Sequence, residues 1–201
     1  LNYLYALWFA IHKENQYIAL IFDSNEKARA AFRDFMWICT NHSIHTDDNA
    51  ILFTNNAKIC FVSAQTAAKG SVKGRNIDLT IIDEAAWLNE HTFNDVVACL
   101  FPTLSCKTTN QIILSSTVGN VDHPFFKLVE YAQNRQYSSF AITQVPWNCV
   151  PGRTKRWLQR MFIDMRRKIY SARIFERMAN IFKSCLNTTK GLFNEEQPLF
   201  L

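Results

Sequence analysis

The chain has 201 residues, 48% of them hydrophobic, and its 22 Lys and Arg outnumber its 17 Asp and Glu to give a formal net charge of +5. This length suits one domain with a full core, and the composition excludes intrinsic disorder, collagen-like repeats and coiled coil. A membrane-spanning helix is excluded because no run of about 18 apolar residues is free of charge, and the N-terminal stretch lacks the pattern of a signal peptide.

The first predicted elements alternate between helix and strand. Apolar residues recur at helical spacing over residues 1–15, which predicts an amphipathic helix. The apolar run 17–22 predicts a buried strand, and the polar residues 23–25 are typical of a helix cap. The helix that follows carries Ala28, Phe32, Phe35 and Cys39 on one face. Because the chain starts at Leu1, inside a predicted helix, we expect it to be a piece of a longer protein.

Further along, short apolar runs continue to alternate with helical patterns. We predict a hairpin from residues 51–54 and 58–63, helices near 92–101 and 124–134, and strands at 79–82, 111–115 and 140–145. Strands that are apolar throughout and separated by helices indicate an α/β fold, with a mainly parallel sheet flanked by helices. In such folds the functional site lies at the carboxyl ends of the strands.

The segment 153–183 has a different character. It holds ten Lys and Arg against two acidic residues, a local charge of 10 − 2 = +8, so the remaining residues sum to 5 − 8 = −3. Its basic face makes it a candidate for contacts with DNA phosphates, through residues such as Arg156, Arg160, Arg166 and Arg167. The alternative is a solvated face of an amphipathic helix.

The six cysteines are scattered without a CxxC pair, so we expect them to stay reduced inside the cell. Cys39, His42 and His45 form a C-x2-H-x2-H string. A helix end with solvated histidines is the preferred interpretation over a metal site, because no fourth ligand is evident nearby.

The strongest local motif is LTIIDEAAW, residues 79–87, in which an apolar strand ends in Asp83 and Glu84. In phosphate-transferring enzymes of this architecture the first acid holds Mg²⁺ and the second polarises the attacking water. The alternative is that the acids only return the chain to solvent.

Two other segments add to this motif. The strand at 111–115 opens into small hydroxylated residues, including Ser116 and Thr117, which can sense a γ-phosphate or simply form a turn. Shortly before the acidic strand, Lys73, Gly74 and Arg75 form a loop that is either a candidate phosphate or DNA contact or a solvated turn.

The order of these segments resembles the ATPase domain of the viral large terminase subunit, the DNA-packaging motor of tailed phages and herpes-like viruses. VKGRNIDLTIIDEAAW is similar to that family's Walker B region, and ILSSTVG resembles its coupling motif. The segment YIALIFDSNEKARAAFRDF resembles the strand and helix that follow the family's phosphate loop. The segment TTKGLFNEEQPLF resembles the junction with the family's nuclease domain. The resemblance covers nearly the whole chain, but only the first two motifs are specific.

The resemblance implies a RecA-like P-loop NTPase core that uses ATP and Mg²⁺. It implies Asp83 as the Mg²⁺ ligand, Glu84 as the catalytic carboxylate, and Ser116 and Thr117 as coupling residues. Residues 1–150 would be the ATPase core, 151–190 a basic helical extension, and 191–201 the start of a linker. Implied partners are double-stranded DNA, further copies in a ring, the portal and the small terminase subunit, inside the host cell and in its nucleus if the host is a eukaryote.

One departure from the family pattern is that no G-x-x-x-x-G-K-[ST] loop occurs in the 201 residues. This loop cradles the phosphates and stands, in the family, just before the helix that residues 1–16 resemble, so we expect the chain alone to bind ATP poorly. Two alternatives remain open. One is the first domain of a DEAD-type helicase, against which stands Trp87, where those enzymes have Asp or His. The other is a non-catalytic nucleic-acid-binding or scaffold module.

Overall fold

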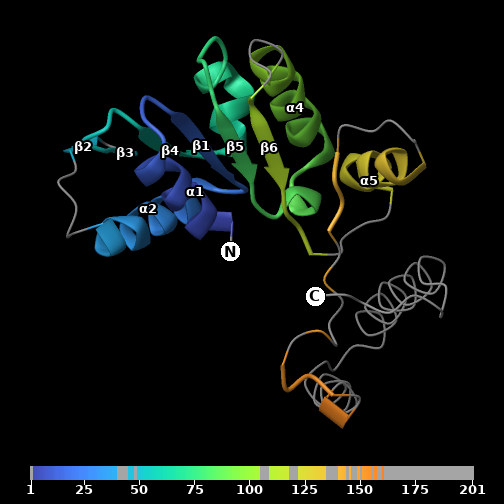
Figure 1. Ribbon diagram of the computed structural model, residues 1–201. Coiled ribbons are helices and arrows are strands. Elements are labelled where there is room, and N and C mark those ends of the chain that lie inside the picture. The colour runs from blue at the N-terminus through green and yellow to red at the C-terminus, as the bar shows by residue number, and fades with distance from the viewer. Residues whose placement is uncertain are drawn as a thin grey trace. The chain divides into compact units, whose positions relative to one another are not determined.

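The computed structural model describes residues 2–39, 45–47, 49–104, 109–117, 122–134, 140–143, 145, 149, 151–154, 156–157 and 160. The chain divides into two compact units, Leu1–Leu128 and Val129–Leu201. The fold described below is that of the first unit (Figure 1). Among the described residues, no helix combines the length and the apolar character needed to cross a bilayer.

The first unit alternates helices and strands from its start. Its elements are α1 (Asn2–His12), β1 (Tyr17–Phe22), α2 (Asn25–Cys39), β2 (His45–Asp47), β3 (Ala50–Leu52), β4 (Lys58–Ser63), α3 (Ala64–Thr66), the π-helical turn η1 (Ala67–Ser71), β5 (Leu79–Ile82), the 3₁₀ turn η2 (Ala85–Trp87), α4 (Glu90–Leu104) and β6 (Gln111–Leu114). The last described helix, α5 (Pro124–Asn134), begins in this unit and ends in the second.

These bounds confirm the predicted helices and strands up to residue 134, within a few residues at each end. The strand predicted at 140–145 is wrong, since the described residues of that segment, 140–143 and 145, form none. An apolar run makes a strand only where a neighbour supplies ladder hydrogen bonds, and the described sheet includes no strand from this segment.

The six strands form one sheet in the order β2-β3-β4-β1-β5-β6. Four of them, β4, β1, β5 and β6, are parallel neighbours, as in the pairings Ile18 with Leu79 and Ile81 with Ile113. The short β2 and β3 add an antiparallel end beyond β4, which confirms the predicted hairpin. The sheet is therefore mainly parallel, as predicted.

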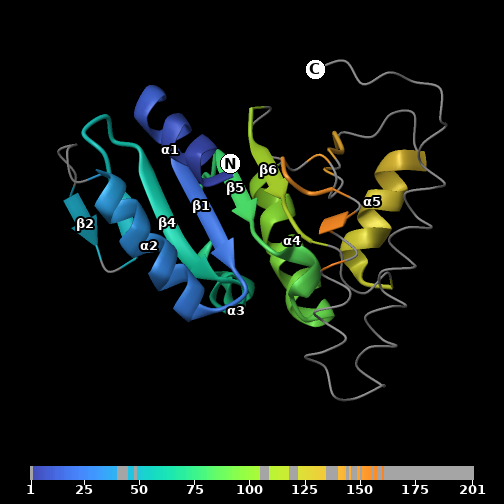
Figure 2. The same ribbon diagram turned by 90° about the horizontal axis from the view of Figure 1, so that it is seen from below.

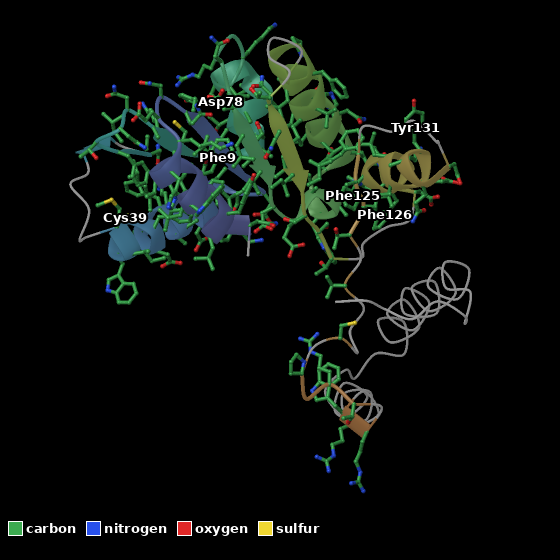
Figure 3. The ribbon with its side chains drawn as sticks, viewed as in Figure 1. Phe9, Cys39, Asp78, Phe125, Phe126 and Tyr131 are labelled. Carbon is green, nitrogen blue, oxygen red and sulfur yellow. The ribbon has the colours of Figure 1, made fainter. Side chains whose placement is uncertain are left out.

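Both faces of the sheet are covered, because successive side chains of a strand point to opposite faces. On β1, Ile18 and Leu20 pack with α1 and α2, while Ala19 and Ile21 pack with α3, η1 and α4. Phe9 of α1, labelled in Figure 3, is one of the largest side chains that are fully buried. Two apolar layers thus hold the parallel strands rigidly between helices.

The parallel strands bring their carboxyl ends to one edge of the sheet. This edge lies toward the bottom of Figure 1, where the arrowheads of β5 and β6 end, and it faces the viewer in Figure 2. Polar residues follow each of these strands: Asp23 after β1, Ser63 at the end of β4, Asp83 after β5 and Ser115 after β6. α1 begins at the same edge, where the Tyr3 hydroxyl donates a hydrogen bond to Asp83.

Candidate functional site

The acidic pair lies in a tight turn at the end of β5. The Asp83 backbone N–H donates to the carbonyl of Ile21 at 3.0 Å and so extends the ladder with β1 by one bond. Glu84 then adopts the left-handed conformation, with φ 53° and ψ 42°, before η2 begins. A residue with a Cβ pays about 1–2 kcal/mol in this region. Strained backbone of this kind is concentrated at functional sites.

The loop after β6 is joined to this turn through hydrogen bonds from the backbone. The Ala85 N–H donates to the carbonyl of Ser115 at 3.0 Å, and the Ala86 N–H donates to the Ser116 hydroxyl at 3.1 Å. The structure therefore brings Ser116, a predicted coupling residue, directly against the segment that carries Asp83 and Glu84.

Both carboxylates also receive hydrogen bonds from side chains. The Ser115 hydroxyl donates to Asp83 Oδ1 at 3.0 Å, and the Tyr3 hydroxyl donates to Asp83 Oδ2. The Thr117 hydroxyl donates to Glu84 Oε2 at 3.1 Å and accepts the Trp87 indole N–H at 2.8 Å. Each acid is thus oriented by a hydroxyl of the neighbouring loop, and Asp83 by a helix as well.

Tyr3 is half-buried, and its ring lies 5.9 Å from that of Phe22 and 6.1 Å from that of Phe35, centroid to centroid. Burial raises the pKa of Tyr3 well above its ordinary value, and the hydrogen bond to Asp83 raises it further. The phenol therefore keeps its proton at neutral pH and remains a donor to the carboxylate.

The site suits a divalent cation that is shared with a phosphate ligand. Mg²⁺ prefers one or two carboxylates together with water and phosphate oxygens, rather than a cage built by protein alone. An ionised carboxylate has about four lone-pair positions, so Asp83 keeps room for a metal beside its two donors. In the described part of the chain, no three His, Cys, Asp or Glu side chains are grouped as metal ligands.

Other sequence-predicted residues lie away from the acidic turn. Arg75 donates to the Tyr17 hydroxyl at 2.5 Å, and its guanidinium carbon lies 5.5 Å from the centroid of the Tyr17 ring. Tyr17 opens β1 beside Asp78, which Figure 3 shows at the end of β5 opposite its arrowhead. Six residues of strand, about 20 Å, separate this edge from the carboxyl edge. The Lys73–Arg75 loop is therefore not part of the acidic site, and its contact with phosphate or DNA stays a prediction.

Two further predictions concern residues beyond this site or beyond the described chain. Arg156 and Arg160 are exposed in the second unit, whereas Arg166 and Arg167 lie outside the described residues. His42 of the C-x2-H-x2-H string also lies outside them, and Cys39 is a fully buried member of the core. The roles of these residues stay predictions.

Sequence reasoning did not assign Tyr3, Ser115 or Trp87 to the site. Ser115 directly precedes Ser116 at the end of the same strand, and this position could have indicated that it belongs to the site. No local pattern marks Tyr3, because its contact with Asp83 spans 80 residues of sequence.

Comparison with known proteins gives one matching family. The family model described as "Terminase large subunit, T4likevirus-type, N-terminal" matches residues 4–145, which is most of the chain. No curated protein sequence matches the chain.

Two solved structures share the fold. The large terminase of bacteriophage HK97 aligns with a TM-score of 0.54 and 15% identity over 64% of this chain. A mutant of the large terminase ATPase domain of Thermus phage P74-26 aligns with a TM-score of 0.50 and 15% identity over 84% of this chain and 77% of its own. The chain spans 29% of the length of the HK97 protein. The predicted α/β, RecA-like fold class is confirmed by this likeness.

Proposed function

The chain belongs to the family of T4-type terminase large subunit N-terminal domains, and we propose that it forms the ATPase core of a viral motor that couples ATP hydrolysis to translocation of double-stranded DNA. One observation carries this proposal: the Asp83–Glu84 turn is hydrogen-bonded to the loop 115–117 at the carboxyl edge of a parallel sheet. The family match also favours this function over that of a DEAD-type helicase.

In this proposal each carboxylate has its own task. Asp83 would hold Mg²⁺ together with ATP, and Glu84 would polarise the water that attacks the γ-phosphate. Mg²⁺ supplies neutralisation of the charge on the phosphate oxygens. Ser115 and Tyr3 fix the Asp83 carboxylate, and Thr117 fixes that of Glu84, so the two groups are oriented before a nucleotide arrives.

The loop after β6 supplies the coupling between chemistry and movement. Ser116 contacts the turn through the Ala86 N–H, and Thr117 contacts the Glu84 carboxylate itself. A change in the charge or position of Glu84 on hydrolysis would therefore reach the loop after β6 directly through Thr117, and a shift of the turn would reach it through Ser116. Switch segments of other nucleotide-hydrolysing proteins respond to loss of the γ-phosphate in a comparable way.

The start of α1 supports a phosphate-binding loop upstream of it. Tyr3, in the first turn of α1, already contacts Asp83, so a loop that led into this helix would lie near the Asp83 carboxylate. Backbone N–H groups at the start of a helix favour phosphate. ATP would thus be held by that loop on one side and by Asp83 on the other.

The proposed partners are double-stranded DNA, further copies of the protein in a ring, the portal and the small terminase subunit, within the host cell. The basic segment 153–183, with its local charge of +8, supports contacts with DNA phosphates. Such contacts are independent of sequence and weaken steeply as salt is raised.

The proposal is tested by ATP turnover of the protein expressed with the coding sequence that precedes Leu1. We expect turnover to be stimulated by double-stranded DNA, less so at higher salt, and abolished by Glu84→Gln. The matched control is Glu26→Gln, which changes an exposed carboxylate on α2 and should leave turnover unchanged. Full turnover in Glu84→Gln would exclude Glu84 from catalysis, and a wild-type protein without ATPase activity would favour the non-catalytic alternative.

A further inference from the structure

We propose that Trp87 is a positioning residue that orients the Glu84 carboxylate through the hydroxyl of Thr117. This inference rests on the proposed function of Glu84 as the carboxylate that polarises water. The proposed function gives Trp87 no role, yet the one polar group of its side chain contacts the site. The indole N–H donates to Thr117 Oγ1 at 2.8 Å.

The direction of the hydrogen bonds gives Trp87 its effect. A hydroxyl has one proton to donate and two lone pairs that accept. At Thr117 the indole N–H occupies a lone pair, since an indole can only donate. The hydroxyl proton is then directed to Glu84 Oε2, 3.1 Å away, because an ionised carboxylate can only accept. Without the indole, the hydroxyl is free to rotate toward water, and the carboxylate keeps from Thr117 only the longer bond donated by the backbone N–H, at 3.5 Å.

The backbone around Trp87 holds the ring where this bond forms. The Trp87 N–H donates to the Glu84 carbonyl at 2.9 Å, which closes the 3₁₀ turn. One residue later, the Leu88 carbonyl accepts from Nε2 of the buried His123 at 3.0 Å. The Phe125 N–H donates to Nδ1 of the same ring at 3.1 Å, so Nε2 is the nitrogen that carries the proton. Both ends of the turn are thus fixed, so the Trp87 backbone stays where the indole can reach Thr117.

Burial in the core does not account for this tryptophan. Trp87 is 59% exposed, so most of the side chain lies in solvent although the indole N–H is hydrogen-bonded. A large aromatic side chain held at the surface by one polar contact is better explained by that contact than by packing.

The kinetic test uses Trp87→Phe, which keeps an aromatic ring and removes the N–H donor. We expect kcat for ATP to fall about tenfold, equal to about 1.4 kcal/mol of transition-state stabilisation, while KM for ATP is unchanged. Trp8→Phe is the matched control, because Trp8 is also half-exposed but stacks on Tyr5 and His12 of α1, and among the described residues no hydrogen bond joins it to the acidic turn. In a protein that already carries Trp87→Phe, Thr117→Val should lower kcat little further, because both substitutions break the same chain of hydrogen bonds to Glu84.

A spectroscopic test separates this inference from the proposed function. The indole N–H resonance of Trp87, identified by its loss in Trp87→Phe, is followed in the nucleotide-free protein. We expect Thr117→Val to move this resonance strongly and Glu84→Gln to move it through the hydroxyl, whereas Trp8→Phe leaves it in place. If the wild type shows no ATPase activity, the proposed function fails, but the resonance still reports the hydrogen bonds. An unmoved resonance in Thr117→Val, or an unchanged kcat in Trp87→Phe of an active protein, overturns the role of Trp87.

Discussion

The left-handed backbone at Glu84 predicts an unusual order of stability between two substitutions. Glu84→Ala and Glu84→Gly remove the same carboxylate and the same bond to Thr117, so they differ only in the Cβ. At φ 53° that Cβ costs about 1–2 kcal/mol, whereas the greater freedom of glycine in the unfolded chain costs about 0.4–1 kcal/mol. We therefore expect the Gly variant to be more stable than the Ala variant by about 0.5–1 kcal/mol.

Urea denaturation of both variants, followed by circular dichroism, measures this difference as a shift in midpoint at constant m-value. The control is the same pair of substitutions at Arg33, an exposed residue within α2. There the order should be reversed, with Ala more stable than Gly by about 1 kcal/mol, because glycine is the poorer residue in a helix. If Ala is the more stable residue at both positions, Glu84 is not left-handed in solution and the argument from backbone strain is wrong.

Two further predictions concern the ends of α1. Because burial raises the pKa of Tyr3, the protonated phenol stabilises the folded state fully below the ordinary tyrosine pKa of about 10, and this contribution is lost as the pH rises through the higher folded value. We therefore expect the stability advantage of the wild type over Tyr3→Phe, measured by urea denaturation, to be constant below about pH 10 and to shrink above it; an advantage that grows with pH would contradict the assignment. At the other end, Asn55 Nδ2 donates to the carbonyls of Ala10, Ile11 and Lys13 at 2.8, 3.2 and 3.3 Å, so Asn55→Ala should lower the free energy of unfolding by about 1–2 kcal/mol. Asn94→Ala, on an exposed position of α4, is its control and should change stability by less than about 0.5 kcal/mol.

The elements that bury a continuous apolar face could be predicted from the sequence. The runs 17–22 and 79–82 have almost no polar side chains, and only a strand covered on both faces satisfies such a pattern. Their position in a parallel sheet then determined that Asp83 and Ser115 would meet at one edge, although they are 32 residues apart. Periodicity and topology together therefore predicted which loops form the site.

The contacts made by single side chains could not be predicted in this way. The hydrogen bond of Tyr3 to Asp83 depends on how α1 crosses the sheet, and the sequence of α1 specifies only which face is apolar. Arg75 is close to Asp83 in sequence, but β5 lies between them and carries them to opposite edges. The strand predicted at 140–145 rested on a short apolar run, but Phe140 and Ile142 are 40% and 38% exposed and the described sheet includes no strand from this segment.

The left-handed conformation of Glu84 makes the acidic turn depend on its contacts with the loop 115–117. Nothing local favours the left-handed region there, since neither Glu84 nor its neighbours are glycine, so the strain of about 1–2 kcal/mol must be offset by contacts of the turn. The loop 115–117 supplies these contacts: it bonds Asp83 and Glu84 through their carboxylates, and Ala85, Ala86 and Trp87 through N–H groups, at about 1 kcal/mol net for each bond. If the loop withdraws, Glu84 loses both its hydroxyl donor and the contacts that hold its backbone. The placement of the Glu84 carboxylate and the position of the loop after β6 are therefore one structural variable, as the proposed coupling of hydrolysis to movement would require.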